Sequence, residues 1–562
     1  MQKTWNLKKY DESLVEKIKS KYNVSEIMAK LLISRNIEFE EIDGFLNGNI
    51  EDFKDPYGIK DMEKIVERID KAISNKEKIC IYGDYDVDGI TSITIMYKFL
   101  TKLGADVMYY LPDRLIEGYG INNNALDEIK KKGVSLVITV DCGITAVEEV
   151  EHSKQIGLDI CITDHHECTP VLPDALAIVN PKRKDDEYGF KFLAGVGVAF
   201  KVINALAIKY KLPKEEYLQY LDIVSIGTIS DIVPLVGENR IISKCGLKMM
   251  EKTQNVGLKA LIKLVNVKEM DSMMVSFGMA PRINACGRMG NASAAVKLLL
   301  EEDENKAEKI ALELDNLNQE RKDVETIIYE QALEMIAKNN LDKKNSIVLY
   351  SSSWHNGVIG IVASRLVGIY YKPVILLTKE HGIIRGSGRC PAGFSIYDAL
   401  TECKDKVIQF GGHELAAGLS VEEDKIQEFI DAFEEAAKKR SSAICDQIID
   451  IDVQVEKKDL NGQIIRDIRS MRPYGQSNPV PLFLYKGLRV NAIRTIKDEK
   501  HLKLVLRDDR SLIDAIGFSM GARRDEIRIG DKIDVVGAIE LNTYNTPKTI
   551  QFILQDFKKS VE

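Results

Sequence analysis

Between Lys78 and about Pro181, short apolar runs alternate with amphipathic stretches, and this rhythm limits the possible folds more than any other feature. The expected strands are Lys78–Gly83, Asp106–Leu111, Leu136–Asp141, Leu158–Asp164 and Ala175–Asn180. The expected helices between them are Ile90–Leu103, Asn123–Lys132 and Ala146–Ile156. Alternation of this kind predicts an α/β domain with a parallel, doubly wound sheet, whose ligands bind beyond the carboxyl ends of the strands.

Acidic side chains follow three of these strands. They are Asp84, Asp86 and Asp88 after the first, Asp141 at the end of the third, and Asp164 with the adjacent His165 and His166 after the fourth. The carboxyl ends of parallel strands share one edge, so these groups should converge. Clustered carboxylates repel one another, and a divalent ion such as Mg²⁺ or Mn²⁺ relieves the repulsion. The alternatives are a solvated acidic turn, a helix cap at Asp141 and a pair of surface histidines.

A further acid stands in the apolar segment DIVSIGTISDIVPL, which spans Asp222–Leu235. Asp231 has Ile229, Ile232 and Val233 around it, and burying a bare carboxylate among such side chains is costly. A metal ion would be a suitable partner. The alternative is that Asp231 caps the N-terminus of a helix.

Composition narrows the class of protein. A length of 562 residues suggests three or four domains. The N-terminus has no apolar core of a signal peptide, and no apolar run is long enough to span a bilayer, which favours the cytoplasm and no membrane. Nine cysteines without a CxxC pair argue against structural zinc and a disulfide framework. With a net charge of −8, any nucleic-acid surface must concentrate its basic groups locally.

The whole chain is predicted to have five regions. Residues 1–75 have helical spacing, 76–300 contain the acidic sheet domain, and 301–342 are expected to form a long connector helix. A second α/β domain is expected over 343–442, and a C-terminal domain over 443–562. The last domain has apolar runs at Leu488–Ile493, Leu502–Leu506, Leu512–Phe518, Lys532–Ile539 and Thr549–Leu554, which predict a five-stranded OB-fold barrel.

The motifs GDYDVDG, VDCG, TDHHE and GTISDIVPL, in this order, resemble those of the DHH phosphoesterase superfamily. An Asp in place of His in the first motif resembles the RecJ group of single-strand-specific 5′→3′ exonucleases. MAPRINACGRMG resembles the segment that follows the metal domain in that group, and SWHNGVIGIVASRL, RGSGR and GGHELAAG resemble its second lobe, the DHHA1 domain.

The resemblance implies hydrolysis of single-stranded DNA from the 5′ end by two divalent ions, Mn²⁺ or Mg²⁺, with release of nucleoside 5′-monophosphates in DNA repair and recombination. The implied metal ligands are Asp84, Asp86, Asp88, Asp141, His165 and Asp231, with Asp141 as the bridge. Asp84 is also expected to be catalytic. His166 would contact the scissile phosphate or move a proton, and Asp164 would orient its neighbours.

The implied phosphate-binding residues are Arg282, Asn284, Arg288, Gln319, Ser387, Arg389 and His413, with Gly386 and Gly388 bringing backbone N–H groups near the phosphate. Expected strand contacts in the barrel are Arg489, Arg494, Lys500 and Tyr544. Surface ion pairs, tight turns and solvated strand faces are the alternatives. The expected partners are single-stranded DNA and a single-strand-binding protein or a helicase. The protein itself is expected to be a monomer.

Two other functions compete. One is a different DHH phosphoesterase, such as a nanoRNase or a small-substrate phosphatase, but a free dinucleotide or pyrophosphate needs no separate strand-binding barrel. The other is a non-catalytic replication scaffold, against which the complete set of expected ligands argues.

Overall fold

The computed structural model describes residues 3–112, 117, 120–266, 269–290, 292–380, 382–440, 447–509, 511–542 and 548–560. The chain divides into two compact units. The larger comprises mainly Trp5–Pro112, Glu117–Ala280 and Ile449–Glu562, and the smaller mainly Pro281–Ile448. None of the described helices is both long and apolar enough to cross a membrane.

The larger unit contains the predicted parallel sheet. Its strands are β2 (Lys78–Gly83), β3 (Asp106–Tyr110), β4 (Val134–Val140), β5 (Asp159–Thr163) and β6 (Ala177–Val179). They lie in the order β3-β2-β4-β5-β6, and every neighbouring pair is parallel. The order reverses at β2, which has β3 on one side and β4 on the other. Such a switch point leaves a crevice at the carboxyl ends of the two central strands, where α/β proteins bind ligands.

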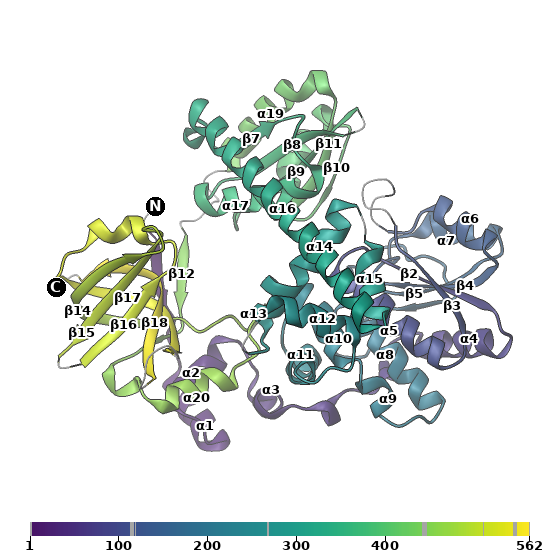
Figure 1. Ribbon diagram of the computed structural model, residues 1–562, viewed down its shortest axis with the longest axis horizontal. Coiled ribbons are helices and arrows are strands. Elements are labelled where there is room, and N and C mark those ends of the chain that lie inside the picture. Colours follow the sequence, from purple (N-terminus) through teal and green to yellow (C-terminus); the bar gives the residue numbers. More distant parts are fainter. Residues whose placement is uncertain are drawn as a thin grey trace. The chain divides into compact units, whose positions relative to one another are not determined.

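Helices cover both faces of this sheet (Figure 1). Helices α6 (Asn123–Lys131) and α7 (Val147–Gln155) share an apolar core with Cys80 and Tyr82 of β2. The alternate residues of β2 point to the opposite face, where α5 (Val87–Lys102) and α8 (Gly195–Lys209) pack against the strands. The other helices of this region are α4 (Met62–Ser74), α9 (Glu215–Leu218), α10 (Leu221–Ser230), α11 (Gly237–Met250), α12 (Val256–Val265) and α13 (Ser272–Met274).

Helix α5 begins three residues earlier than the sequence pattern predicts. Asp86 caps it, because its Oδ1 accepts hydrogen bonds from the backbone N–H groups of Asp88 at 2.8 Å and Gly89 at 3.1 Å. Gly89 lies in the first turn, so close to the preceding loop that an added Cβ would be 2.3 Å from the carbonyl oxygen of Asp84. The alternate spacing of the three acids therefore places Asp88 within the helix and Asp84 before it.

The smaller unit contains the predicted connector helix and second α/β domain. Its helices are α14 (Ala280–Met289), α15 (Ser293–Leu300), α16 (Glu304–Lys338), α17 (Asn356–Tyr370), α18 (Ile396–Glu402) and α19 (Ile426–Arg440). Its strands are β7 (Ile347–Tyr350), β8 (Val374–Glu380), β9 (Ile383–Arg389), β10 (Gln409–Gly412) and β11 (Ala416–Val421), in the order β10-β11-β9-β8-β7. Helix α16 has 35 residues, which makes it about 52 Å long.

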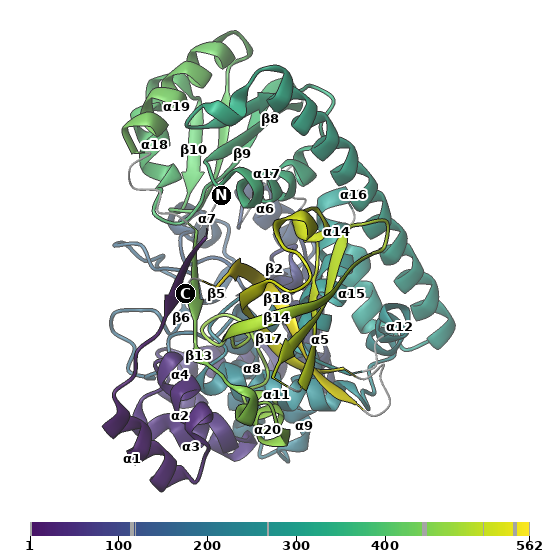
Figure 2. The same ribbon diagram turned by 90° about the vertical axis from the view of Figure 1, so that its left-hand side faces the viewer.

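The C-terminal strands form the predicted barrel, seen in green to yellow in Figure 2. They are β14 (Phe483–Ile496), β15 (His501–Asp508), β16 (Ser511–Gly517), β17 (Lys532–Asn542) and β18 (Thr549–Lys559). Strand β14 pairs with both β15 and β17, which closes the barrel. The flanking elements are β12 (Ile448–Ile451), β13 (Val453–Gln454) and α20 (Gly462–Ser470).

The N-terminal elements pack with this barrel. They are β1 (Thr4–Leu7), α1 (Glu12–Tyr22), α2 (Glu26–Ser34) and α3 (Ile42–Asn47). Ile18 and Leu31 of these helices belong to one apolar cluster with Leu502 and Leu504 of β15. The beginning and the end of the chain therefore share a hydrophobic core.

Candidate metal centre

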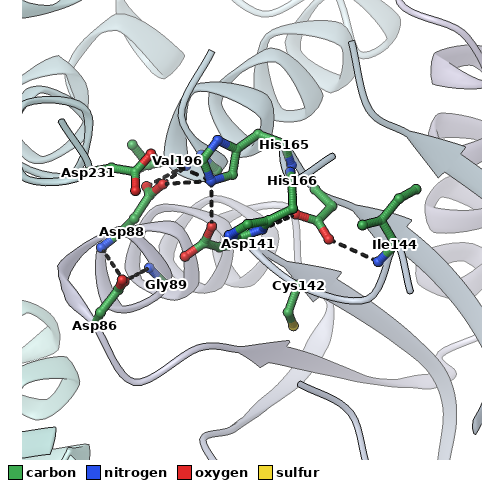
Figure 3. Close-up of polar contacts among 12 residues, drawn as sticks. Asp86, Asp88, Gly89, Asp141, Cys142, Ile144, His165, His166, Val196 and Asp231 are labelled. Atoms are coloured by element: carbon green, nitrogen blue, oxygen red, sulfur yellow. Dashed lines mark hydrogen bonds and ion pairs between the residues drawn. The ribbon is translucent and has the colours of Figure 1, made fainter. Parts of the chain in front are cut away.

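The acidic residues that the sequence singles out converge at the carboxyl edge of the parallel sheet (Figure 3). The loop after β2 carries Asp84 and Asp86, the first turn of α5 carries Asp88, the end of β4 leads into Asp141, and the loop after β5 carries Asp164, His165 and His166. Asp231 comes from a different direction, at the C-terminal end of α10. The structure thus brings together all eight predicted residues of this edge.

His165 lies at the centre of the cluster. Its Nε2 atom is 3.1 Å from Oδ1 of Asp141, 3.5 Å from Oδ2 of Asp231 and 3.8 Å from Oδ2 of Asp88. Three groups have ligand atoms within 4.8 Å of one another, namely Asp84–Asp86–Asp141, Asp88–His165–Asp231 and Asp141–His165–His166. Asp141 and His165 each belong to two of these groups, so the cluster is continuous.

Asp88 is held by the first turn of α8. The N–H of Gly195 donates to its Oδ2 and the N–H of Val196 to its Oδ1, both at 2.7 Å. The N-cap residue of α8 is Ala194, which has no side-chain oxygen to cap the helix, and the carboxylate of Asp88 takes over that role. The positive end of the helix also favours a negative charge on Asp88.

Two glycines allow this close approach. A Cβ on Gly195 would lie 2.6 Å from Oδ1 of Asp141, and a Cβ on Gly227 would lie 2.3 Å from Oγ1 of Thr91 and 3.0 Å from Oδ1 of Asp88. Gly227 opens the motif GTISDIVPL, but Gly195 and the amides of α8 are not among the predicted residues. The GVGV spacing at Gly195–Val198 is their local signal, and it carries no charge or ligand atom.

Asp164 orients the two histidines. Its Oδ1 accepts from the N–H of His165 at 2.7 Å and from Nδ1 of His166 at 2.7 Å, and its Oδ2 accepts from the N–H of Ile144 at 2.9 Å. These bonds place the ring of His165 toward the carboxylates (Figure 3). The His166 side chain remains 42% exposed, so its ring can reach a bound substrate.

Burial and mutual repulsion govern the electrostatics. Burial, with the charge of Asp231, raises the pKa of Asp88 well above its usual value, and burial with the charge of Asp88 does the same to the pKa of Asp141. Burial and the charge of Asp86 raise the pKa of Asp231 to about 7. The metal-free cluster is therefore short of positive charge.

The histidines shift in opposite directions. Burial and the neighbouring His166 lower the pKa of His165 to about 3, so its imidazole is neutral at physiological pH. Burial also opposes a charge on His166, but the hydrogen bond and charge of Asp164 outweigh it and raise the pKa of His166. Burial alone would raise the pKa of Asp164, but the hydrogen bond and charge of His166 lower it.

These residues fit divalent metal ions. The Nε2 atom of His165 is buried and makes no hydrogen bond to the described part of the chain, although it faces three carboxylates. A neutral imidazole among carboxylate oxygens suits Mn²⁺ or Mg²⁺. The expected helix-cap roles do not apply, because the N-cap position of α7 is Ala146, without a side-chain capping bond, and Asp231 stands at the C-terminal end of α10.

The predicted phosphate-binding residues belong to the smaller unit. Ser387 and Arg389 lie on the same side of β9, with Arg389 Nη1 3.0 Å from Ser387 Oγ. Gly386 and Gly388 of this strand are not backbone donors toward a ligand. They pair within the sheet, and an added Cβ would meet Leu377 at 2.5 Å or Ile396 at 2.5 Å, so close packing explains them.

The other predicted phosphate contacts are spread over several elements. Arg282 Nε lies 2.8 Å from Oδ1 of Asp315, and Arg288 Nη1 donates to the carbonyl of Gly357 at 3.1 Å. Asn284 is half-buried on α14, Gln319 is exposed on α16, and His413 is exposed beside β10. Three of these five residues share α14, and Arg288 contacts α17, whose Gly360 lies against Ser387 and Arg389.

In the barrel, Arg489 and Arg494 are exposed on β14, and Lys500 is exposed just before β15. Arg489 Nη1 donates to the carbonyl of Gly530 at 2.9 Å. Tyr544 lies outside the described residues.

Known proteins match this chain over nearly its whole length. The DHH family, N-terminal domain, matches residues 78–228, the DHHA1 domain matches 343–439, and the RecJ OB domain matches 451–556. The single-stranded-DNA-specific exonuclease RecJ of Bacillus subtilis is 40% identical over 561 residues, which are 98% of this chain and 70% of the relative.

Two solved structures of RecJ from Thermus thermophilus have the same fold. The complex with Mn²⁺ is similar with a TM-score of 0.86 and 27% identity, covering 100% of this chain and 80% of the other. The complex with Mg²⁺ has a TM-score of 0.80 and 26% identity, covering 100% and 79%.

Proposed function

Because the chain belongs to the RecJ family of single-stranded-DNA-specific exonucleases, we propose that it hydrolyses single-stranded DNA from the 5′ end and releases nucleoside 5′-monophosphates. The observation that carries this proposal is the convergence of five carboxylates and His165 at the switch point of the parallel sheet. A single charged loop would be ordinary on a protein surface. Buried acids from three separate elements, around a neutral imidazole, support a catalytic metal centre.

We assign two ion positions within this cluster. Asp84, Asp86 and Asp141 would hold one ion, and Asp88, His165 and Asp231 the other, with Asp141 between the two sets. When bound, two divalent ions such as Mn²⁺ or Mg²⁺ lower the pKa of a coordinated water and neutralise charge that develops on the phosphoryl oxygens.

The protein side chains complete the chemistry. Burial opposes a charge on His166, but the hydrogen bond and charge of Asp164 raise its pKa, so its ring holds a proton more readily than a free imidazole. An imidazolium in this position donates a hydrogen bond to the scissile phosphate or a proton to the departing 3′ oxygen. Asp164 fixes the orientation of the ring, and Asp84 completes the charge of the cluster next to the reacting phosphate.

Basic and polar groups elsewhere would bind the strand itself. In the smaller unit these are Arg282, Asn284, Arg288, Gln319, Ser387, Arg389 and His413, and in the barrel Arg489, Arg494 and Lys500. Guanidinium groups bind phosphates through paired hydrogen bonds, and Ser387 beside Arg389 adds a hydroxyl donor. The family role also supports a cytoplasmic monomer that acts with a single-strand-binding protein or a helicase in repair and recombination.

One assay separates the competing functions. The protein is incubated with 5′-labelled single-stranded DNA, duplex DNA, a dinucleotide and pyrophosphate, each with Mn²⁺ and with a chelator. We expect turnover of the single-stranded DNA in the reaction with Mn²⁺ and none in the reaction with the chelator. Turnover restricted to dinucleotide or pyrophosphate would instead indicate a small-substrate phosphatase, and no turnover of any substrate would indicate a scaffold.

Substitution of Asp141 tests the metal assignment. We expect Asp141→Ala to lose cleavage by a factor of about 10³ or more while it still binds the strand, because the cluster loses its shared ligand. Asp174→Ala is the matched control, since that carboxylate is on the same domain but its side chain is 93% exposed. Normal cleavage by Asp141→Ala, measured as release of 5′-label, would show that the assignment is wrong.

A further inference from the structure

Ile232, the residue after the proposed metal ligand Asp231, has an unusual backbone. Its φ angle is 60°, in the left-handed region that β-branched side chains avoid because of steric crowding. Among the described non-glycine residues with positive φ, Ile232 is the only β-branched one, and most of the others are Asn, Asp, Lys or Ser. Folding by itself favours Asn or Gly at such a position.

Burial does not explain the isoleucine either. Its side chain is 70% exposed, so the apolar surface that would justify the residue in a core remains in water. The loop around it is held from both sides. The N–H of Asp231 donates to the carbonyl of Gly227 at 2.9 Å, and the N–H of Leu235 donates to the carbonyl of Gln476 at 2.9 Å.

The anchoring on the far side of Ile232 is extensive. Leu235 is buried, and a Cβ on Gly475 would lie 2.6 Å from its Cδ1. Nδ2 of Asn239 donates to the carbonyl of Pro234 at 3.1 Å. The chain is therefore anchored before and after Ile232, which adopts the left-handed conformation between the two anchors and remains exposed. Backbone strain that is imposed in this way is concentrated at functional sites.

The position of Ile232 directly after Asp231 indicates a role in binding the substrate. Asp231 faces the cluster, with its Oδ2 3.5 Å from Nε2 of His165, and the Cα of Ile232 is about 3.8 Å from the Cα of Asp231. A nucleotide whose phosphate lies at the cluster extends its sugar and base outward by more than that distance. Ile232, which is 70% exposed, is the apolar residue that directly follows this ligand in the chain.

We infer that Ile232 contacts the base of the 5′-terminal nucleotide, and thereby helps the site to accept an unpaired end. This inference rests on the proposed function. An apolar contact with the face of a base is tolerant of sequence, because every base has such a face. It favours an unpaired end, since a paired terminal base would first have to leave its complement to turn toward Ile232.

The test uses Ile232→Asn, because Asn adopts positive φ readily and removes the apolar contact. Release of the first nucleotide is followed in Mn²⁺ under single-turnover conditions. The substrates are two single strands of one sequence, with either a normal or an abasic 5′-terminal nucleotide. Thermal unfolding and Mn²⁺ affinity by calorimetry are measured alongside. Ile529→Asn is the control, because Ile529 is also 70% exposed but lies in the barrel domain.

On the normal strand we expect Ile232→Asn to lower kcat/KM about tenfold, the effect of one lost apolar contact. The abasic end should lower wild-type cleavage by a similar factor, and on that strand wild type and Ile232→Asn should be equal. The melting temperature should stay the same or rise, and Mn²⁺ affinity should not change. Ile529→Asn should show no dependence on the terminal base beyond that of wild type.

Equal cleavage of the normal strand by both proteins would overturn the inference. A deficit that persists on the abasic strand, or a loss of Mn²⁺ affinity, would do the same, because it would show that Ile232 acts on the fold or on Asp231. If the wild type itself leaves every strand intact, the proposed function fails, and this inference fails with it.

Discussion

At the scale of single residues, Asp231 links the metal centre to pH. Burial and the charge of Asp86 raise its pKa from 3.8 to about 7 in the metal-free protein. Between those two values the folded state holds a proton that the unfolded chain has released. The free energy of unfolding of the metal-free protein should therefore fall as the pH rises through this window.

The affinity for a metal ion should depend on pH in the opposite direction. An ion must displace the proton of Asp231, so the apparent Mn²⁺ affinity should rise by up to about tenfold per pH unit below about pH 7, and level off above it. Calorimetry in buffers of different protonation enthalpy counts the protons released. In Asp231→Asn the dependence should become shallower. A Mn²⁺ affinity in wild type that is the same at pH 6 and pH 8 would contradict the prediction.

At the scale of elements, the N-terminus of α8 fixes the positions of two carboxylates of the cluster. Its first two amides hold both oxygens of Asp88, and Gly195 lets Asp141 lie against the helix. Helix α5 supplies the charge and α8 supplies the donors, so the packing of two helices determines how one carboxylate faces the ion. Groups that orient metal ligands in this way typically matter for affinity almost as much as the ligands themselves.

Gly195→Ala tests this arrangement. The added methyl group would lie 2.6 Å from Oδ1 and from Cβ of Asp141, so we expect Mn²⁺ affinity to fall about 10- to 100-fold in calorimetry. Gly197→Ala is the matched control on the same helix, since its methyl group would meet Leu193 at 3.2 Å and lies away from the acids. It should bind Mn²⁺ like the wild type. Unchanged affinity in Gly195→Ala would mean that Asp141 can shift without cost.

At the scale of the whole molecule, the two ends of the larger unit depend on each other. Arg35 of the N-terminal region is buried and reaches Asp452 with Nη1 at 2.7 Å and Nη2 at 3.1 Å. Asp452 also accepts the N–H of Leu482 at 3.0 Å, just before the first barrel strand. One buried ion pair therefore joins the helices at the start of the chain to the barrel at its end.

Loss of the guanidinium should destabilise the barrel strongly. In Arg35→Met, Asp452 stays buried with only part of its positive partners, and we expect a loss of about 3–5 kcal/mol. Urea unfolding can be followed by fluorescence of Trp5, whose Nε1 donates to Asp556 at 2.7 Å, in a Trp354→Phe background. Lys19→Met removes an exposed pair with Glu16 and should leave the unfolding midpoint almost unchanged. Equal midpoints for the two variants would refute the prediction.

Much of the fold can be predicted from the sequence because it is periodic. The runs that predict β2, β4 and β5 are buried strands, and the expected five barrel strands and long α16 are present. Element boundaries are harder to predict. Helix α5 begins at Val87 because Asp86 caps it, and an acid that could be a ligand or a cap looks the same in the sequence. The glycines Gly386 and Gly388 are a similar case, since packing and phosphate binding both favour a residue without a side chain.

The sequence by itself determined the strand rhythm and the acids that follow the strands, because side-chain periodicity is a local property and parallel strands end at a common edge. Only the tertiary structure decided that Asp88 caps α8, that His165 faces three carboxylates and that Arg35 meets Asp452 across 417 residues of chain. Such contacts form between segments distant in sequence, through backbone amides and buried charges, and they leave no period or spacing that can be read in either segment alone.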